Sequence, residues 1–246
     1  MSRHPRPTDV WISAIRAAVA IGGLAVPDIT VRANDSVPPD RFIQQVVAQT
    51  TRSGLAIRAV RELRAGTASG KHQGWMTVET SASPSGAFSW NVLTEGGSNR
   101  TREKVFRAVL DTEAAAWRAG ARDAAALTPE NYTFTRLSSA SARQVQIRLT
   151  PRRGDSKLID GVLIVSPDGY PLQLEGTLAR SPSFWVKSVR IVKRYGRIAG
   201  IALPTVIESH ADLKLFGKST FTMRYRYQEV NGRAVPATAL TAELKP

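Results

Sequence analysis

The stretch Phe221-Thr-Met-Arg-Tyr-Arg-Tyr-Gln228 alternates strictly between apolar and polar residues. Successive side chains of a β-strand point to opposite faces, so a period of two places all the apolar residues of this stretch on one face. One buried face and one solvated face are typical of an antiparallel sheet. The same alternation recurs at Val145/Ile147/Leu149 and at Leu172/Leu174/Leu178. The sequence therefore predicts an antiparallel sheet as the centre of the fold.

Seven strands are expected in the second half of the chain. They are predicted at 131–138, 143–151, 159–166, 171–180, 184–195, 201–212 and 219–230. Short runs rich in glycine, proline, asparagine and aspartate separate them and predict turns, most clearly Pro151-Arg-Arg-Gly-Asp155, Ser166-Pro-Asp-Gly169 and Asn231-Gly232. No helical pattern alternates with these strands, so parallel βαβ units are not expected.

A β-hairpin is expected before these strands. Trp75–Thr80 and Phe88–Val92 flank the turn sequence Ser83-Pro-Ser-Gly86, which has proline and glycine where a chain reversal needs them. Phe88, Trp90 and Val92 share one face of their strand because they are two residues apart. The hairpin therefore extends the sheet toward the N-terminal half.

A helix is expected after the hairpin. Gly96-Gly97-Ser98-Asn99 ends the strand and provides a helix cap, and it lacks the lysine and the spacing of a phosphate-binding loop. The helix continues through the alanine-rich Ala114–Ala126, with an interruption at Gly120. Its apolar residues recur at helical spacing, as Val105, Phe106, Val109 and Leu110.

A pair of basic amphipathic helices is expected before the hairpin. Ser36-Val-Pro-Pro-Asp40 is typical of a helix start, and apolar residues follow at helical spacing, namely Ile43, Val46 and Val47. After Gly54, apolar residues recur on one side of a second helix and arginines on another: Ala56, Val60 and Leu63 against Arg58, Arg61 and Arg64. Such a pair either covers the sheet with its arginines in water or contacts an anionic membrane.

Residues 1–33 are interpreted as a secretory signal peptide. Arg3 and Arg6 give a positive start, residues 17–26 form an apolar run, and small side chains at Val31 and Ala33 are typical of a cleavage site. The apolar run is far shorter than the roughly 20 residues that span a bilayer. We expect cleavage near Ala33, a periplasmic mature protein, and one α+β domain over 34–246 in which helices cover an antiparallel sheet.

The composition is that of a folded, basic protein. Of 246 residues, 42% are apolar and 22% charged, which is enough apolar material for a core. The net charge of +14 either favours polyanions, such as anionic lipid headgroups, acidic polysaccharide or nucleic acid, or serves solubility. The chain has no cysteine, which excludes a disulfide, a thiolate nucleophile, a cysteine-bound metal and a lipid anchor on cysteine.

No arrangement of residues predicts catalysis, a metal site or a cofactor, so we expect a protein that is not an enzyme. His4, His72 and His210 lie far apart and lack the spacing of metal ligands. The Gly-x-Ser-x-Gly turn of many hydrolases is missing. Glu175 and Glu208 form a carboxylate pair only if their strands bring them together, and the alternation places Glu175 on the polar face.

A series of short motifs covers most of residues 60–232. They are Gly74-Trp-Met76, Glu95-Gly-Gly-Ser98, Leu127-Thr-Pro-Glu-Asn-Tyr132, Gly161-Val-Leu-Ile-Val165, Asp168-Gly169, Leu174-Glu-Gly176, Phe184-Trp-Val-Lys187, Leu203-Pro204, Met223-Arg-Tyr-Arg-Tyr227 and Val230-Asn-Gly232. In these motifs the chain resembles the exported LolA/LolB-type lipoprotein-carrier superfamily, and within it the outer-membrane lipoprotein-sorting-like proteins. The resemblance implies an unclosed antiparallel β half-barrel, curved around helices, whose concave apolar face holds acyl chains. The family's lid-closing arginine is not assigned by the sequence to any one arginine.

The predicted function is that of a periplasmic binding or carrier protein, which holds a lipid or a lipoprotein acyl chain for transport to, or sorting at, the outer membrane. The residues expected to line its concave face are Trp75, Phe88, Trp90, Leu149, Leu174, Phe221, Met223 and Tyr225. At the rim, contact with anionic headgroups or an anionic membrane surface is expected from Arg190, Lys193 and Arg194. Each apolar side chain alternatively belongs to a closed core, and the volume of the cavity decides between the two.

The alternative function is that of a non-enzymatic envelope sensor or scaffold, which binds another protein through its outer sheet face. The resemblance allows it, because the same fold also serves as an envelope-stress sensor. A filled interior with an exposed apolar patch favours this alternative. Nucleic acid is not an expected partner, because the arginines and tyrosines of 224–227 alternate to opposite faces. The sequence leaves the ligand and the oligomeric state open, and a monomer is the expectation.

Overall fold

The computed structural model describes residues 40–50, 54–70, 72–118, 125–137, 143–214 and 217–236. The expected signal peptide 1–33, the helix start at 36–39 and the interruption at Gly120 lie outside these ranges and stay predictions. The strands are β1 (Ile57–Thr67), β2 (Gly74–Ala82), β3 (Phe88–Gly97), β4 (Tyr132–Arg136), β5 (Val145–Pro151), β6 (Ile159–Val165), β7 (Pro171–Leu178), β8 (Val186–Ile198), β9 (Ile201–Leu213), β10 (Gly217–Val230) and β11 (Arg233–Ala234). The helical segments are α2 (Arg41–Thr50), α3 (Asn99–Thr101), the π-helix η1 (Arg102–Arg107) and α4 (Ala108–Arg118).

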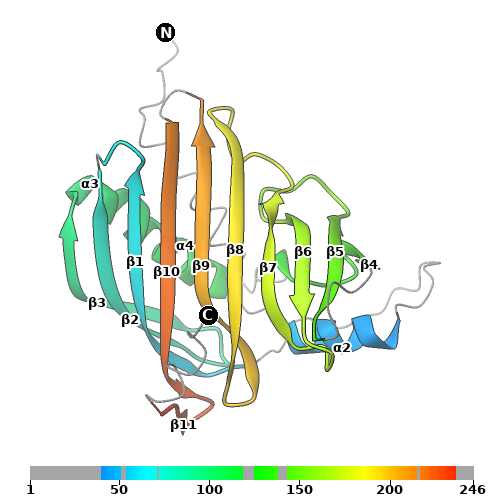
Figure 1. Ribbon diagram of the computed structural model, residues 1–246. Coiled ribbons are helices and arrows are strands. Elements are labelled where there is room, and N and C mark those ends of the chain that lie inside the picture. Colours follow the sequence, from blue (N-terminus) through cyan, green and yellow to red (C-terminus); the bar gives the residue numbers. More distant parts are fainter. Residues whose placement is uncertain are drawn as a thin grey trace.

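The strands form one antiparallel sheet in the order β3-β2-β1-β10-β9-β8-β7-β6-β5-β4, with β11 beside β10 (Figure 1). Because β3 and β4 are the two ends of this path, the sheet does not close into a barrel. The chain runs outward from β1 to β3 and then crosses behind the sheet through α3, η1 and α4. It enters β4 at the far edge and returns strand by strand to β10, beside β1. This crossing connection covers one face, which we call the inner face.

Eight side chains in register form a row across the inner face. Each comes from one of eight neighbouring strands, which follow one another in the order β2-β1-β10-β9-β8-β7-β6-β5. The members of this inner row are Met76, Leu63, Met223, Ile207, Lys193, Leu174, Leu163 and Ile147. All eight are buried, and all except Lys193 are apolar. Alternate residues of the same strands point to the outer face, which helices leave uncovered in Figure 1. The row makes the inner face one continuous apolar surface.

The helices pack on two parts of the sheet. The segment η1–α4 contacts β2 and β3 and buries Val105, Phe106, Val109 and Leu110 on its apolar side. Helix α2 packs beside β7 and β9 with Ile43 and Val46 buried. None of the helices in the described part of the chain is long and apolar enough to cross a membrane.

The fold class expected from the sequence is confirmed: an α+β protein with an unclosed, curved antiparallel sheet and helices on its concave face. The seven strands predicted in the second half correspond to β4–β10, and the predicted hairpin to β2 and β3. Gly86 has a φ of +86°, which explains the glycine in the hairpin turn. The Ser98 hydroxyl accepts a hydrogen bond from the backbone N–H of Thr101 at 3.3 Å, so the predicted helix cap is confirmed.

One element differs from the prediction. The prediction of a second basic helix is wrong, because residues 57–67 form β1, in the interior of the sheet. The apolar residues of this stretch recur at helical spacing and also at a spacing of two, the latter as Ile57, Ala59, Leu63 and Ala65. Arg61 interrupts the second pattern, which hides the strand. The structure selects the strand because β1 pairs along its length with β2 on one side and β10 on the other. The first predicted helix is confirmed as α2.

Candidate functional site

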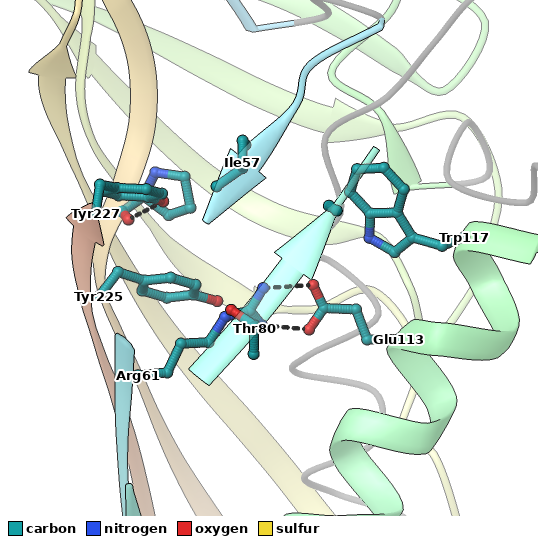
Figure 2. Close-up of a pocket in the computed structure, with 9 residues that line it drawn as sticks. Ile57, Arg61, Thr80, Glu113, Trp117, Tyr225 and Tyr227 are labelled. Carbon is teal, nitrogen blue, oxygen red and sulfur yellow. Dashed lines mark hydrogen bonds and ion pairs between the residues drawn. The ribbon is translucent and has the colours of Figure 1, made fainter. Parts of the chain in front are cut away.

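Arg61 and Glu113 form an ion pair between the sheet and the helix behind it. Arg61 points to the inner face of β1, because it lies two residues from the buried Leu63. Glu113 lies four residues after Val109 and four before Trp117, on the buried side of α4. The guanidinium donates from Nη1 to Oε2 at 2.6 Å and from Nη2 to Oε1 at 3.1 Å (Figure 2). Two parallel charge-assisted hydrogen bonds fix the orientation of both groups.

Aromatic rings surround the ion pair. The Cζ atom of Arg61 lies 4.8 Å from the ring centroid of Tyr225 and 5.3 Å from that of Phe88, within the range of cation–π attraction. Tyr225 stacks on Tyr227 with centroids 5.9 Å apart, and Phe88 stacks on Trp117 of α4 at 6.0 Å. The guanidinium is therefore held by one carboxylate and two ring faces, in surroundings from which the rings exclude water.

Burial determines the electrostatics of this site. Only 6% of Arg61 and 8% of Glu113 is exposed to solvent. Burial by itself lowers the pKa of Arg61, but the charge of Glu113 and its hydrogen bonds outweigh this and raise the pKa above its ordinary value. Burial also raises the pKa of Tyr225 and Tyr227, which keeps both phenols neutral. Arg61 therefore carries a positive charge at every physiological pH.

A cavity of about 20 Å³ adjoins the ion pair and is bordered by Trp117, Tyr225 and Tyr227. This volume holds about one water molecule. An acyl chain therefore does not fit beside the ion pair in this conformation. Within the described residues, the buried Nε of Arg61 has no hydrogen-bond partner, although the residue lines the cavity. Beside this cavity, one donor of the guanidinium has no partner among the described residues.

Lys193 is a second buried cation on the inner face. It lies on β8 within the inner row, beside Ile207 of β9 and Leu174 of β7. Its Nζ atom is 5.0 Å from the ring centroid of Tyr195, and 7% of the residue is exposed. Burial lowers the pKa of Lys193 to about 8, and the charge of Glu113 opposes this shift. Among the residues that the structure describes, the buried charged side chains are Arg61, Lys193 and Glu113.

Seven of the eight residues expected to line the concave face lie on the inner face, packed into the core or against it. The fully packed ones are Leu149, Leu174, Phe221 and Met223, and the partly buried ones are Phe88 and Trp90. Tyr225 is the one of the eight that borders the cavity. Trp75 is on the outer face, with 41% exposed, because its neighbour Met76 takes the inner position on β2. The expected place of Trp75 on the concave face is therefore wrong.

The three cations expected at the rim do not lie together. Arg190 and Arg194 point to the outer face of β8, where they pair with Glu175 and with Glu208, the latter at 3.1 Å. Lys193 points to the inner face, because residues three apart on a strand lie on opposite sides. The ion pairs of Arg190 and Arg194 border an open groove of about 580 Å³ on the outer face. A rim made of these three residues is therefore not formed.

The described residues include no group of three or more histidine, aspartate and glutamate side chains placed to hold a metal ion. Glu175 and Glu208, the carboxylates considered for hydrolysis, are each paired with an arginine. His72 and His210 are both exposed. What the inner face offers chemically is a large apolar surface with a pair of cations and one carboxylate at its centre.

Sequence reasoning missed the ion pair, although a signal for it was present. The prediction places Arg61 on the water-facing side of a helix and does not single out Glu113. Arg61 occupies an inward position in the alternation of β1, and Glu113 occupies an inward position in the helical spacing of α4. One charge of opposite sign on the apolar face of each of two elements indicates a buried pair, because charges are almost never buried alone.

Comparison with known proteins adds similarities of fold. No protein-family model matches the sequence, and no curated protein is significantly similar to it. The structure of a LolA superfamily protein from Nitrosomonas europaea is similar at 10% identity and a TM-score of 0.42, over 82% of this chain and 97% of that chain. A DUF1329 family protein from Desulfovibrio piger is similar at 10% identity and a TM-score of 0.37, over 79% and 93%. The first of these structures carries the name of the superfamily that the sequence motifs resemble.

Breaking the buried ion pair on one side should destabilise the fold strongly. Arg61→Met leaves Glu113 buried without its partner, and Glu113→Leu does the same to Arg61, so each should lower the free energy of unfolding by about 3–5 kcal/mol. The double variant should regain most of that loss, because neither member of the pair then stays buried without the other. Denaturant unfolding measures all three, and Arg148→Met, which breaks the exposed pair with Asp160, is the control with an expected loss below about 1 kcal/mol. A double variant as unstable as the single ones would contradict this account.

Lys193 should make stability depend on pH. Its pKa is about 8 in the folded protein, against an ordinary value of 10.5, so the unfolded chain binds more protons between these values. Stability should therefore rise with pH from about 8 to 10, by up to on the order of 3 kcal/mol. Lys193→Met should lack this rise and be more stable than the parent at pH 7. Parallel unfolding curves at pH 7, 8, 9 and 9.5 test this, and equal slopes for both proteins would contradict it.

Proposed function

We propose that this protein is a carrier for an acyl chain, and that the structure describes a conformation in which α4 is closed over the sheet. The observation that supports the proposal is the inner row: seven apolar side chains and one lysine, contiguous over eight strands of a sheet that does not close. A sheet with two free edges can change its curvature more easily than a barrel. An acyl chain laid along such a face gains about 0.8 kcal/mol per methylene removed from water.

Loading requires that α4 moves away from the sheet. The cavity beside α4 is about 20 Å³, so the chain must replace side chains that now cover the inner face. The Arg61–Glu113 pair joins α4 to β1 across this interface, with Phe88 and Trp117 stacked beside it. We propose that α4 acts as a lid and that this pair fastens it. Fully breaking a buried pair without replacing its partner is costly, so the lid stays closed until a ligand compensates.

A basic, aromatic loop between β7 and β8 is proposed to contact the membrane. Phe184 has 74% of its surface exposed, and its ring centroid lies 3.6 Å from the Lys214 Nζ and 5.4 Å from the Trp185 ring. Arg180 and Arg153 border the hollow beside Phe184. Aromatic residues with cations around them suit the interface of an anionic bilayer. A contact of this kind fits the proposed periplasmic location, between two membranes, and a binding function without catalysis.

The sensor or scaffold alternative is supported less well by the surface. Its expected mark is an exposed apolar patch beside a filled interior. The outer face is lined over β7–β10 mainly by charged and polar side chains. The large exposed apolar residues of the described part are Trp75, Leu93 and Phe184, which are spread over β2, β3 and the β7–β8 loop.

Native mass spectrometry tests the carrier function directly. The protein is purified from the periplasm of a bacterial host, and lipids that co-purify with it are extracted and identified. We expect a stoichiometric lipid or lipopeptide mass that is lost on delipidation and regained on incubation with amphiphiles. A clean apo mass that stays unchanged after challenge with anionic lipids would contradict the carrier and favour the sensor.

The membrane contact has its own test. Phe184→Ser should weaken binding to vesicles that contain anionic lipid by on the order of tenfold, because burial of a phenylalanine side chain contributes about 1.5–3 kcal/mol. Leu93→Ser removes a residue that is 48% exposed on β3, far along the sheet, and should leave binding unchanged. Co-sedimentation measures both variants. Equal binding of Phe184→Ser and the parent would contradict the contact.

A further inference from the structure

Cations gather at one end of the sheet. Because consecutive strands are antiparallel, the β5–β6 turn (152–158), the β7–β8 turn (179–185) and Lys214 after β9 all lie at this end (Figure 1). The charged residues of these segments are five cations and one carboxylate, namely Arg152, Arg153, Lys157, Arg180 and Lys214 against Asp155. A surplus of positive charge at one end of a molecule attracts anions.

A hollow of about 520 Å³ lies between the first two of these turns. It is lined by residues 153–156 and 180–184, which are mostly polar or charged. Its volume is within the range of pockets that hold small ligands, and its lining suits a polar group better than an acyl chain. Phe184, the exposed residue of the proposed membrane contact, also borders it. The hollow therefore lies where a membrane surface would be met.

Two groups that line the hollow lack a partner among the described residues. Arg180 is exposed and forms no ion pair with any of them. The Oγ atom of Ser183 is buried and has no hydrogen-bond partner there. Buried polar atoms are nearly always hydrogen-bonded, so an unpaired hydroxyl in a basic hollow points to an oxygen of a ligand as its partner.

Arg153 is held in place on the β5–β6 side of the hollow. Its Nη1 atom donates to Oδ1 of Asn131 at 2.7 Å, and its Nε lies 3.6 Å from Oδ2 of Asp155. The other carboxylate oxygen of Asp155 accepts a hydrogen bond from the backbone N–H of Lys157 at 2.9 Å. Because Asp155 is engaged through both oxygens and faces a cation, it repels an anion in the hollow less than an unpaired carboxylate would.

We propose that this hollow binds the phosphate group of a membrane lipid, with Arg180 and Arg153 as the cations and the Ser183 hydroxyl as a hydrogen-bond donor. A guanidinium matches two phosphate oxygens with two parallel N–H groups, and the hydroxyl can donate to a third. The inference rests on the membrane contact proposed above and specifies its headgroup chemistry. When Phe184 enters the bilayer, the hollow beside it comes to the depth of the lipid phosphates, which favours a lipid over a soluble phosphate as the source.

The test compares two anionic lipids, of which one carries its charge on a phosphate. Vesicles of phosphatidylcholine contain phosphatidic acid in one set and cholesteryl hemisuccinate in the other, at matched zeta potential. Co-sedimentation with the purified protein gives both affinities, and their ratio is the phosphate preference. We expect phosphatidic acid to be preferred by about tenfold, because hydrogen bonds to a charged group add to the attraction between opposite charges.

Two variants locate the phosphate. Arg180→Gln and Ser183→Ala should each lower the phosphate preference several-fold. Ser183→Ala should do so without lowering the Tm, because the hydroxyl that it removes has no partner to lose among the described residues. Arg226→Gln is the matched control, since it removes one exposed arginine from β10, outside the hollow. It should leave the phosphate preference unchanged.

The outcomes separate this inference from the membrane contact. Equal affinities for the two lipids, or a preference that survives both Arg180→Gln and Ser183→Ala, would overturn the phosphate site and leave the membrane contact standing. Failure to bind either kind of vesicle would overturn both. Isothermal titration with inorganic phosphate tests the source, and binding as tight as that to the vesicles would overturn the lipid in favour of a soluble phosphate.

Discussion

The constraint on which this structure depends is the apolar face of a sheet that does not close. A closed barrel hides its interior by its own curvature, whereas an open sheet of ten consecutive strands needs a cover. The chain supplies that cover by its connectivity, because the connection from β3 to β4 must cross from one edge to the other and carries η1 and α4 over the inner face. The cover and the sheet belong to one packed core, in which Phe106 of η1 and Phe221 of β10 meet at 6.4 Å between ring centroids.

Within that core, the Arg61–Glu113 pair differs from everything around it. Most contacts between α4 and the sheet are apolar and tolerate small shifts, whereas two hydrogen bonds at 2.6 and 3.1 Å fix the helix at one position. A purely apolar interface would not fix the helix in this way. Lys193, three strands further on, is a second buried cation on the same face.

The sequence predicted the positions of the strands and helices better than it predicted the face to which each side chain points. The strands β4–β10 were expected from alternation and turns, since both signals are local. The stretch that became β1 was expected as a helix, because Arg61 stands where the alternation requires an apolar residue. Trp75 was expected on the concave face, but Trp75 and Met76 are both apolar, and a shift of one residue moves a side chain to the other side. Lys193 was grouped with Arg190 and Arg194, although a side chain an odd number of positions along a strand points to the opposite face of the sheet.

By itself, the sequence determined that the chain forms a one-sided antiparallel sheet with a few helices, because the period of two, the turn residues and the helix cap each act over a handful of neighbours. Only the tertiary structure decided that Arg61 meets Glu113, 52 residues away, and that Lys193 lies in the middle of an apolar row. It also decided that the cavity beside the Arg61–Glu113 pair has a volume of only about 20 Å³. Those outcomes depend on strand order and on where the crossing helix lies, and both result from packing the whole chain at once.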